Sequence, residues 1–458
     1  MLAAGAYAEL VRGIRFGRGD TESARARASI FEALPAEVRA LRHQWLGTVS
    51  VGCAATWGVH ERCDFSCTAC YLTAHANETP PLPFDEVRAQ LDTIRREKGP
   101  GANTQITAGE VTLLPVGELV RIVRYARDIG LDPMVMTHGQ TFVRDRAYLP
   151  TLMREGGLRK IALHVDATQR GRTGVPTRAT ERELMSVREE LAQIVRDARS
   201  TTGLPLHADH TVTVTRDNIA ELSDVIRWNV RNADVFRALG LLPVASVGRT
   251  RGHAGVDRTE VDAAIESALG RSITRSTFEM GHPDCHTQAL FWVARAGERV
   301  DIVEARRDGR WIDDVFFDDL ARGAFRGFHL DDASSLETVG RLVGLFRRQP
   351  RYAATWPLFS AYRLGGSLGV ASRIVRAHLT GGTAFVRPFA LIVHQFMQPR
   401  DLATTRGRER LAACTFKVPV DGRLVSMCEM NATSLRDELG RDARDRLVPL
   451  GMRRPADV

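Results

Sequence analysis

The sequence predicts an α/β protein whose core is a partial (β/α)6 TIM-like barrel, with a helical N-terminal extension and a C-terminal α+β region. Three observations predict this fold. The chain has 458 residues, which is long enough for two or three lobes with sizeable cores. Short β-type runs alternate with amphipathic helical stretches between residues 47 and 250, a pattern typical of βαβ units around a parallel sheet. Six such units fit a partial barrel better than an open nucleotide-binding sheet.

Hydrophobic periodicity gives the ranges of the individual elements. The predicted strands are 47–57, 103–110, 132–139, 160–168, 207–215 and 236–249. The predicted helices between them are 84–99, 117–130, 145–155, 180–199 and 218–232. The first helix shows the pattern clearly, because Val87, Leu91 and Ile94 share one face. The second helix closes on a glycine, a common stop signal.

The chain divides into three parts. These are a helical N-terminal extension (1–46), the barrel (47–250) and a C-terminal region (251–458). The C-terminal region has weaker periodicity, with candidate helices at 257–270 and 333–348 and an irregular middle. It ends with a hairpin signal, because Asp421-Gly422 separates two alternating runs.

Composition and charge exclude some classes of protein. The formal net charge is +8, and arginine supplies most of the 63 basic residues. No basic run with interleaved aromatic residues is present, so no nucleic-acid partner is expected. No stretch reads as a transmembrane segment or a signal peptide, which predicts a cytoplasmic protein with reduced thiols. Clustered cysteines in such a protein indicate metal binding or catalysis rather than disulfides.

Three of the seven cysteines, Cys63, Cys67 and Cys70, form a C-x3-C-x2-C array after the first predicted strand. Three thiolates on one loop can hold a 4Fe-4S cluster and leave one iron open. A zinc site would need a fourth ligand, and neither His60 nor His75 completes a standard spacing. Barrel active sites also lie in βα loops such as this one. The array therefore predicts an iron–sulfur site.

The array resembles the cluster motif of the radical S-adenosylmethionine superfamily. In that family the open iron binds S-adenosylmethionine, and the reduced cluster cleaves it. TAGE at the end of the second strand looks like the family's Gly-Gly-Glu motif. The resemblance implies that Ala108, Gly109 and Glu110 contact the methionine amino group, for which a carboxylate is a suitable partner.

The resemblance implies further cofactor contacts at the ends of later strands. Thr137 ends the third strand, and Asp166 ends the fourth, where polar residues of the family commonly meet the ribose. Many members carry an aromatic residue just before the third cysteine. Ala69 stands there in this chain, and Tyr71 follows the cysteine instead, so Tyr71 is the candidate for the adenine contact.

A second set of cysteines, Cys285, Cys414 and Cys428, could hold an auxiliary iron–sulfur cluster. A two-residue turn at Asp421-Gly422 would make Cys414 and Cys428 near neighbours. The alternative is three separate core or surface thiols. Segments 245–250, 281–285 and 394–431 are similar to enzymes of the tetraether-lipid synthase and methanopterin-methylase group, which favours the cluster.

The resemblance implies a radical enzyme that functionalises a carbon centre or transfers a group derived from S-adenosylmethionine, such as a methyl or alkyl group. Its substrate would be a small molecule or a lipid, with apolar segments between 355 and 397 as candidate lining. A reducing partner such as flavodoxin or ferredoxin would supply the electron. The alternatives are transfer of a 3-amino-3-carboxypropyl radical, maturation of a peptide, and a non-catalytic iron–sulfur protein. No D-x-H-x-x-G motif indicates a bound corrinoid, and the sequence assigns no catalytic side chain.

Overall fold

The computed structural model describes residues 21–250, 255–272, 276–307, 309–319 and 384–448, with short segments between 340 and 380. The predicted helices within 1–20, most of 333–348 and the apolar stretch 355–366 lie outside the described residues. No helix among the described residues is both long enough and apolar enough to cross a membrane.

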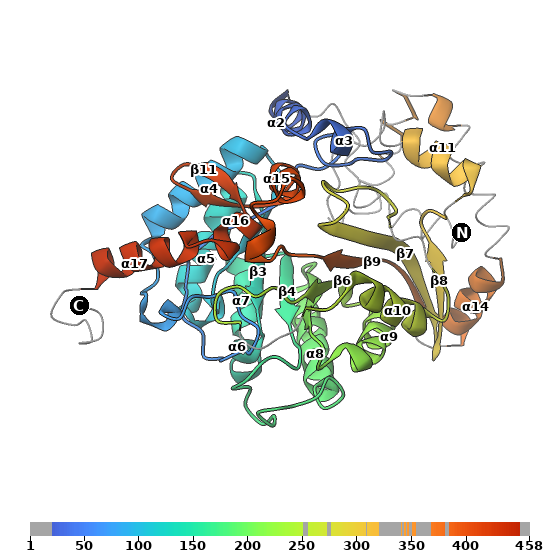
Figure 1. Ribbon diagram of the computed structural model, residues 1–458. Helices are drawn as coiled ribbons and strands as arrows, with labels where there is room; N and C mark the ends of the chain where they lie inside the picture. The colour runs from blue at the N-terminus through green and yellow to red at the C-terminus, as the bar shows by residue number, and fades with distance from the viewer. Residues whose placement is uncertain are drawn as a thin grey trace.

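One sheet of eleven strands runs through the molecule in the order β11-β10-β1-β2-β3-β4-β5-β6-β9-β7-β8 (Figure 1). The strands are β1 Cys53–Ala55, β2 Asn103–Ile106, β3 Asp132–Thr137, β4 Lys160–His164, β5 His207–Val214, β6 Phe236–Pro243, β7 His286–Ala296, β8 Arg299–Glu304, β9 Ala384–His394, β10 Phe416–Val420 and β11 Arg423–Ser426.

The strands β1 to β6 confirm the predicted (β/α)6 core. They are parallel and neighbour one another in chain order. A doubly wound sheet would reverse this order at a switch point, whereas a barrel does not. All six strands fall inside the ranges predicted from the sequence. β1 is the shortest, because residues 47–52 turn instead of extending, with positive φ at Gly47 and Gly52.

Helices cover the outer side of these strands (Figure 1). The α-helices are α2 Thr21–Glu32, α3 Ala36–Arg39, α4 Phe84–Lys98, α5 Val116–Asp128, α6 Gln140–Arg144, α7 Tyr148–Glu155, α8 Met185–Thr202, α9 Leu222–Arg231, α10 Arg258–Leu269, α11 Trp311–Asp319, α14 Leu368–Leu379, α15 Thr405–Ala412, α16 Met427–Ala432 and α17 Leu435–Leu447. Short 3-10 helices are η1 Ala76–Glu78, η2 Val111–Leu113, η3 Ile219–Glu221 and η5 Pro399–Asp401. Val87, Leu91 and Ile94 of α4 are fully buried in the main core, as their spacing predicts.

The C-terminal region extends both edges of the barrel sheet. β10 pairs in parallel with β1, and β9 pairs in parallel with β6. β7 pairs antiparallel with β9 and with β8. The middle of this region shows no clear periodicity in the sequence, and β7, β8 and β9 were not predicted. β7 and β9 nevertheless contribute residues to the wall of the cavity.

The predicted hairpin is confirmed. β10 and β11 are antiparallel and are joined by Asp421 and Gly422, both with positive φ. Two successive left-handed residues fit the right-handed twist of the flanking strands. The pairing of Lys417 with Ser426 brings Cys414 and the start of α16, which carries Cys428, to the open end of the hairpin.

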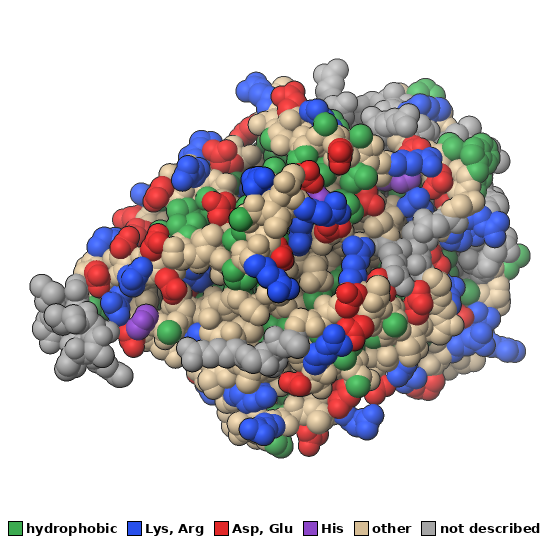
Figure 2. Space-filling view, viewed as in Figure 1, with side chains coloured by type: hydrophobic (Ala, Val, Ile, Leu, Met, Phe, Trp, Pro, Cys, Tyr) green, Lys and Arg blue, Asp and Glu red, His purple; other side chains and the backbone are tan. Residues whose placement is uncertain are grey.

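Charged side chains of both signs are mixed on the surface. Figure 2 shows a face on which Lys and Arg are interspersed with Asp and Glu.

Candidate cofactor and metal site

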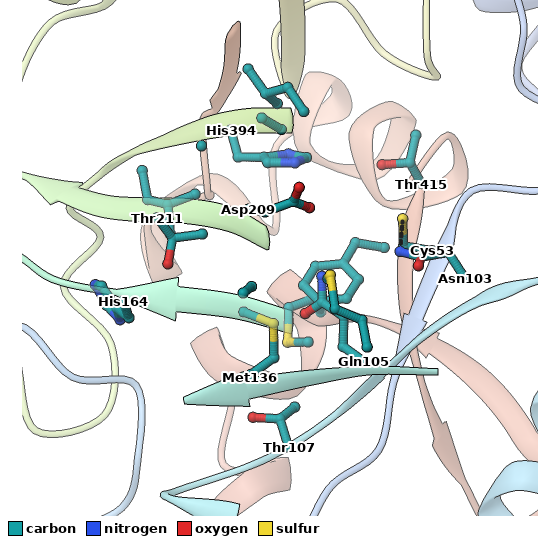
Figure 3. Close-up of a pocket in the computed structure, with 18 of the residues that line it drawn as sticks. Cys53, Asn103, Gln105, Thr107, Met136, His164, Asp209, Thr211, His394 and Thr415 are labelled. Carbon is teal, nitrogen blue, oxygen red and sulfur yellow. Dashed lines mark hydrogen bonds between the residues drawn. The ribbon is translucent and has the colours of Figure 1, made fainter. Parts of the chain in front are cut away.

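A cavity of about 1070 Å³ occupies the interior of the barrel. Cavities for a single small ligand usually hold about 300 to 1,000 Å³, so this one has room for a cofactor and a second small molecule. Its wall is made by side chains at alternate positions of the strands, such as Met134 and Met136 of β3 and Asp209 and Thr211 of β5 (Figure 3). Cys63, Cys67 and Cys70 line the cavity at the carboxyl ends of the strands.

The cysteine loop begins directly after β1 and is held by the loops that follow three other strands. After β4, the carbonyl groups of Thr168 and Arg170 accept hydrogen bonds from the backbone N–H groups of Thr68 and Ser66 (2.9 and 3.0 Å). After β2, the backbone N–H of Glu110 donates to the carbonyl of Arg62 (2.9 Å). The three thiols therefore have a backbone that is fixed from several sides.

The loop after β6 binds the third cysteine. The Arg249 N–H donates to the Cys70 carbonyl (2.8 Å), and the Cys70 N–H donates to Thr250 Oγ1 (2.9 Å). Arg249 Nη2 lies 3.2 Å from Cys70 Sγ. A Cβ at Gly248 would lie 2.3 Å from the Tyr71 carbonyl, so this approach requires glycine. A guanidinium beside the sulfur stabilises a thiolate.

The geometry of the thiols suits a cluster better than a single ion. Burial raises the pKa of Cys63 to about 12 and raises that of Cys67 as well, so thiolates here need a bound cation. Two sulfurs on one zinc lie at most about 4.6 Å apart, since each Zn–S bond is about 2.3 Å. Within the described residues, the three cysteine sulfurs do not all lie within 4.8 Å of one another. In this arrangement the three sulfurs are not drawn together as the ligands of a single zinc ion would be.

Gly109 and Glu110 lie where the TAGE motif predicts, in the wall of the cavity. Gly109 has φ +64, and a Cβ on it would lie 2.2 Å from the His60 carbonyl oxygen. The Glu110 side chain is buried and accepts hydrogen bonds from Thr112 Oγ1 (2.5 Å), Thr137 Oγ1 (2.6 Å) and the His138 N–H (2.9 Å). Glu110 thus joins the ends of β2 and β3 beside the cysteine loop.

Part of the chain is similar in sequence to a known enzyme. No protein-family model matches the chain. The 7,8-dihydro-6-hydroxymethylpterin dimethyltransferase of Methanocaldococcus jannaschii is 24% identical over 192 residues, which cover 42% of this chain and 36% of that protein. The chain resembles the radical S-adenosylmethionine enzymes. The matched part spans only about a third of the length of this curated relative.

Some solved structures show a weaker likeness. anSMEcpe with bound AdoMet has a TM-score of 0.32 and 14% identity, covering 41% of this chain and 50% of that one. Streptococcus suis SuiB bound to S-adenosylmethionine has a TM-score of 0.35 and 11% identity, covering 48% and 47%. A β-glycosidase, BGL167, has a TM-score of 0.25 over 41% of this chain. Similarities this weak support no conclusion about ligands; the topology of the sheet establishes the fold class.

The remaining cofactor residues predicted for a radical S-adenosylmethionine enzyme lie in different settings. Tyr71 lines the cavity, its hydroxyl lies 3.3 Å from Thr107 Oγ1, and the Arg436 guanidinium lies 4.8 Å from its ring centroid. Ala108 is fully buried behind the wall, and packs with Leu72 and Ala76. Thr137 lines the cavity but donates its hydroxyl to Glu110.

Asp166 is fully buried and is not part of the cavity wall, whereas His164 is. The Asp166 carboxylate lies 2.6 Å from His164 Nε2 and accepts from the Thr213 N–H (2.7 Å) and the Thr168 N–H (2.8 Å). Burial alone would raise its pKa, but the His164 charge and these hydrogen bonds hold the pKa of Asp166 below its usual range. Asp166 therefore positions His164 and joins β4 to β5.

The sequence assigned no individual role to His138, Asp64 or Phe65. His138 Nε2 lies 2.7 Å from Asp64 Oδ1, and its ring stacks on Phe65 at 3.8 Å. Ligand atoms of Cys63, Asp64 and His138 lie within 4.8 Å of one another. His138 directly follows Thr137 after β3, and only the fold shows that this segment meets the cysteine loop.

The second set of cysteines comes together from three separate segments. Burial, and then the neighbouring Cys414 and Cys285 thiols, raise the pKa of Cys428 to about 12. Cys285 Sγ accepts from Arg410 Nε (3.1 Å), and Cys414 Sγ lies 2.9 Å from the Phe416 carbonyl oxygen. Only Cys428 of the three lines the cavity. The residues of the apolar segment 389–397 that line the cavity are Phe389, Ala390, Ile392, His394, Phe396 and Met397. Burial lowers the pKa of His394 to about 4.

Proposed function

We propose that this protein is a radical S-adenosylmethionine enzyme that functionalises a carbon centre, or transfers a group derived from S-adenosylmethionine, on a small molecule. The observation that carries the proposal is the cysteine loop: three thiols without disulfides face one cavity, on a backbone held by the loops after β2, β4 and β6. When bound at Cys63, Cys67 and Cys70, a 4Fe-4S cluster supplies an electron to S-adenosylmethionine and an open iron that binds it.

The chain's own residues would bind and orient the cluster and S-adenosylmethionine. Arg249 offsets the negative charge of the thiolate at Cys70. Glu110 lines the cavity and its carboxylate suits the methionine ammonium, while its bonds to Thr137 and His138 fix its orientation. His164, held by Asp166, and Tyr71 are further polar and aromatic groups in the same wall.

The proposal has three further parts that concern the substrate, a second cluster and the electron donor. The first is the substrate: the curated relative acts on a pterin by its name, and a lipid is the alternative. The second is an auxiliary iron–sulfur cluster at Cys285, Cys414 and Cys428. The third is a reducing partner such as flavodoxin or ferredoxin. Cleavage to a 3-amino-3-carboxypropyl radical, and a peptide substrate, are alternatives that use the same cysteine loop.

One experiment tests the proposal. The protein is reconstituted anaerobically with iron and sulfide, reduced with dithionite and mixed with S-adenosylmethionine, and the products are identified by mass spectrometry. 5′-Deoxyadenosine supports the proposal. Methylthioadenosine would instead support 3-amino-3-carboxypropyl transfer. Neither product, from protein with a verified cluster and with pterin or lipid added, would favour a non-catalytic iron–sulfur protein.

A further inference from the structure

The cavity contains a carboxylate that the proposed function does not use. Asp209 lies in the middle of β5, and Figure 3 shows its side chain pointing into the cavity. Among the described residues, no group donates a hydrogen bond to it. Lys160 and Arg237 act on it only through their charges. Lys160 already forms an ion pair with Asp132.

The neighbours of Asp209 leave space beside it. The register of the sheet places Ala162 of β4 and Ala238 of β6 directly opposite Asp209, and Ala390 of β9 beside Ala238. All three alanines line the cavity. Methyl groups cannot pair with a carboxylate, and their small volume keeps the approach to it open. Met136 lies opposite Ala162 on the other side and adds an apolar surface.

The next level of the same wall holds further unpaired polar atoms. Thr211, Gly240, Ile392 and Gln288 follow one another across β5, β6, β9 and β7. Within the described residues, Thr211 Oγ1 and Gln288 Oε1 are buried and have no hydrogen-bond partner. Gly240 between them has no side chain to fill the space. Unpaired buried polar atoms are costly, and three on one wall indicate a ligand that pairs with them.

The chemistry of this wall selects the kind of ligand. A hydrocarbon chain would leave the Asp209 carboxylate unpaired, and an anionic head group would be repelled by it. A carboxylate presents two coplanar oxygens, which pair best with two adjacent N–H donors. A flat heterocycle with such an edge would fit against alanine and methionine surfaces and present its N–H groups to Asp209.

We propose that Asp209 is a specificity-determining residue that binds two adjacent N–H donors of a flat nitrogen heterocycle of the pterin type. This inference rests on the proposed function only in placing the substrate inside the barrel. It names the residue and the edge of the substrate that is recognised. It also favours a heterocycle over a lipid as the occupant.

The test compares two probes on the wild-type, cluster-loaded protein. Pterin carries an exocyclic amino group next to a ring N–H. Lumazine has the same ring system with a carbonyl oxygen in place of that amino group. Isothermal titration calorimetry should show that pterin binds at least about tenfold more tightly than lumazine. The reason is that the amino group of pterin donates to the Asp209 carboxylate, whereas lumazine turns a carbonyl oxygen toward it. Equal affinities, or no binding of pterin, would overturn the proposal.

Variants assign the preference to the residue. Asp209→Asn and Asp209→Ala should each reduce the preference for pterin to about twofold or less, while Asp128→Asn, a change of an exposed side chain on α5, should leave it unchanged. A preference that survives both changes at position 209 would exclude Asp209 as its source. The wild-type comparison does not depend on the folding of any variant.

The same preparations separate this inference from the proposed function. S-Adenosylmethionine cleavage without a preference for pterin would overturn only the role of Asp209. A preference for pterin without cleavage, with the cluster verified, would overturn only the radical mechanism. Loss of both would overturn both.

Discussion

The two groups of cysteines differ in how the chain brings them together. Cys63, Cys67 and Cys70 lie on one loop, and all three thiols line the cavity. Cys285, Cys414 and Cys428 come from three segments, and only Cys428 lines it. The contrast shows what each arrangement requires: the first group needs a loop of correct shape, whereas the second exists only if β7, β9 and the β10–β11 hairpin are all in place.

The partners of the sulfur atoms differ as well. In the first group, Arg249 Nη2 lies 3.2 Å from Cys70 Sγ, and Cys63 Sγ accepts a hydrogen bond from the Phe65 N–H (3.4 Å). In the second group, Arg410, the Phe416 carbonyl and the Met397 N–H each contact one of the thiols. Each thiol of the second group has a polar partner of this kind, so we expect the second group to bind metal less readily than the first.

The largest expected effect comes from removing the first group. Changing Cys63, Cys67 and Cys70 together to alanine should abolish cleavage of S-adenosylmethionine, because no other described cysteine group surrounds the same mouth of the cavity. Product analysis by mass spectrometry measures this. Cys53→Ala is the matched control, since Cys53 lies in β1 and contacts Asn103 (3.3 Å), and it should remain active. Turnover in the triple variant would contradict the proposed function.

The second largest expected effect is on the iron content of the protein, which tests whether both cysteine groups bind a cluster. If both groups bind cubane clusters, changing Cys414 and Cys428 to serine should lower iron from about eight to about four per chain. The first-group variant should then retain about four. Iron and acid-labile sulfide are measured in each variant. Unchanged iron in the variant at Cys414 and Cys428 would show that the second group consists of ordinary packed thiols.

A smaller effect tests the shape of the first loop. Gly109→Ala should lower the free energy of unfolding by roughly 2 to 4 kcal/mol, because the new Cβ would meet the His60 carbonyl oxygen at 2.2 Å in a left-handed backbone. Gly174→Ala is the control: φ is +75 but nothing lies within 4 Å of the new Cβ, so about 1 kcal/mol is expected. Denaturation by urea measures both, and equal losses would show that the close approach does not matter.

The smallest effect concerns the cavity that both groups reach. Burial raises the pKa of Asp209 from 3.8 to about 6, against the charges of Lys160 and Arg237. Between these pH values the folded chain binds more protons than the unfolded chain, so this carboxylate reduces stability as the pH rises through 6. Asp209→Asn should therefore raise the free energy of unfolding by about 1 to 2 kcal/mol at neutral pH.

The pH dependence of that gain is the check. The gain in the free energy of unfolding of the Asp209→Asn variant should shrink as the pH falls from about 7 toward about 4. There the folded wild-type protein and the folded variant are both neutral at position 209. Urea denaturation of both proteins at several pH values measures it. A gain that is constant with pH would show that charge burial is not its cause.

Much of the core could be predicted because the relevant signals are local. Six strands were placed correctly from periodicity, and Asp421-Gly422 marked the hairpin. β7 and β9 were missed because their runs are mostly apolar on both faces, and such runs do not show the alternation of a half-buried strand. Asp209 was missed for a related reason: one carboxylate in a β-type run carries no motif, and its setting comes from Ala162 and Ala238 on other strands.

The sequence by itself determined the cysteine loop, since the spacing of Cys63, Cys67 and Cys70 confines three thiols to one loop wherever that loop lies. It also determined the parallel six-strand core. Tertiary structure alone decided that His138 meets Asp64, that Arg249 meets Cys70, and that Cys285 joins Cys414 and Cys428. The physical reason is that spacing along the chain limits distances only over a few residues. Contacts between distant segments depend on which strands pair, and that is fixed by burial of the whole core.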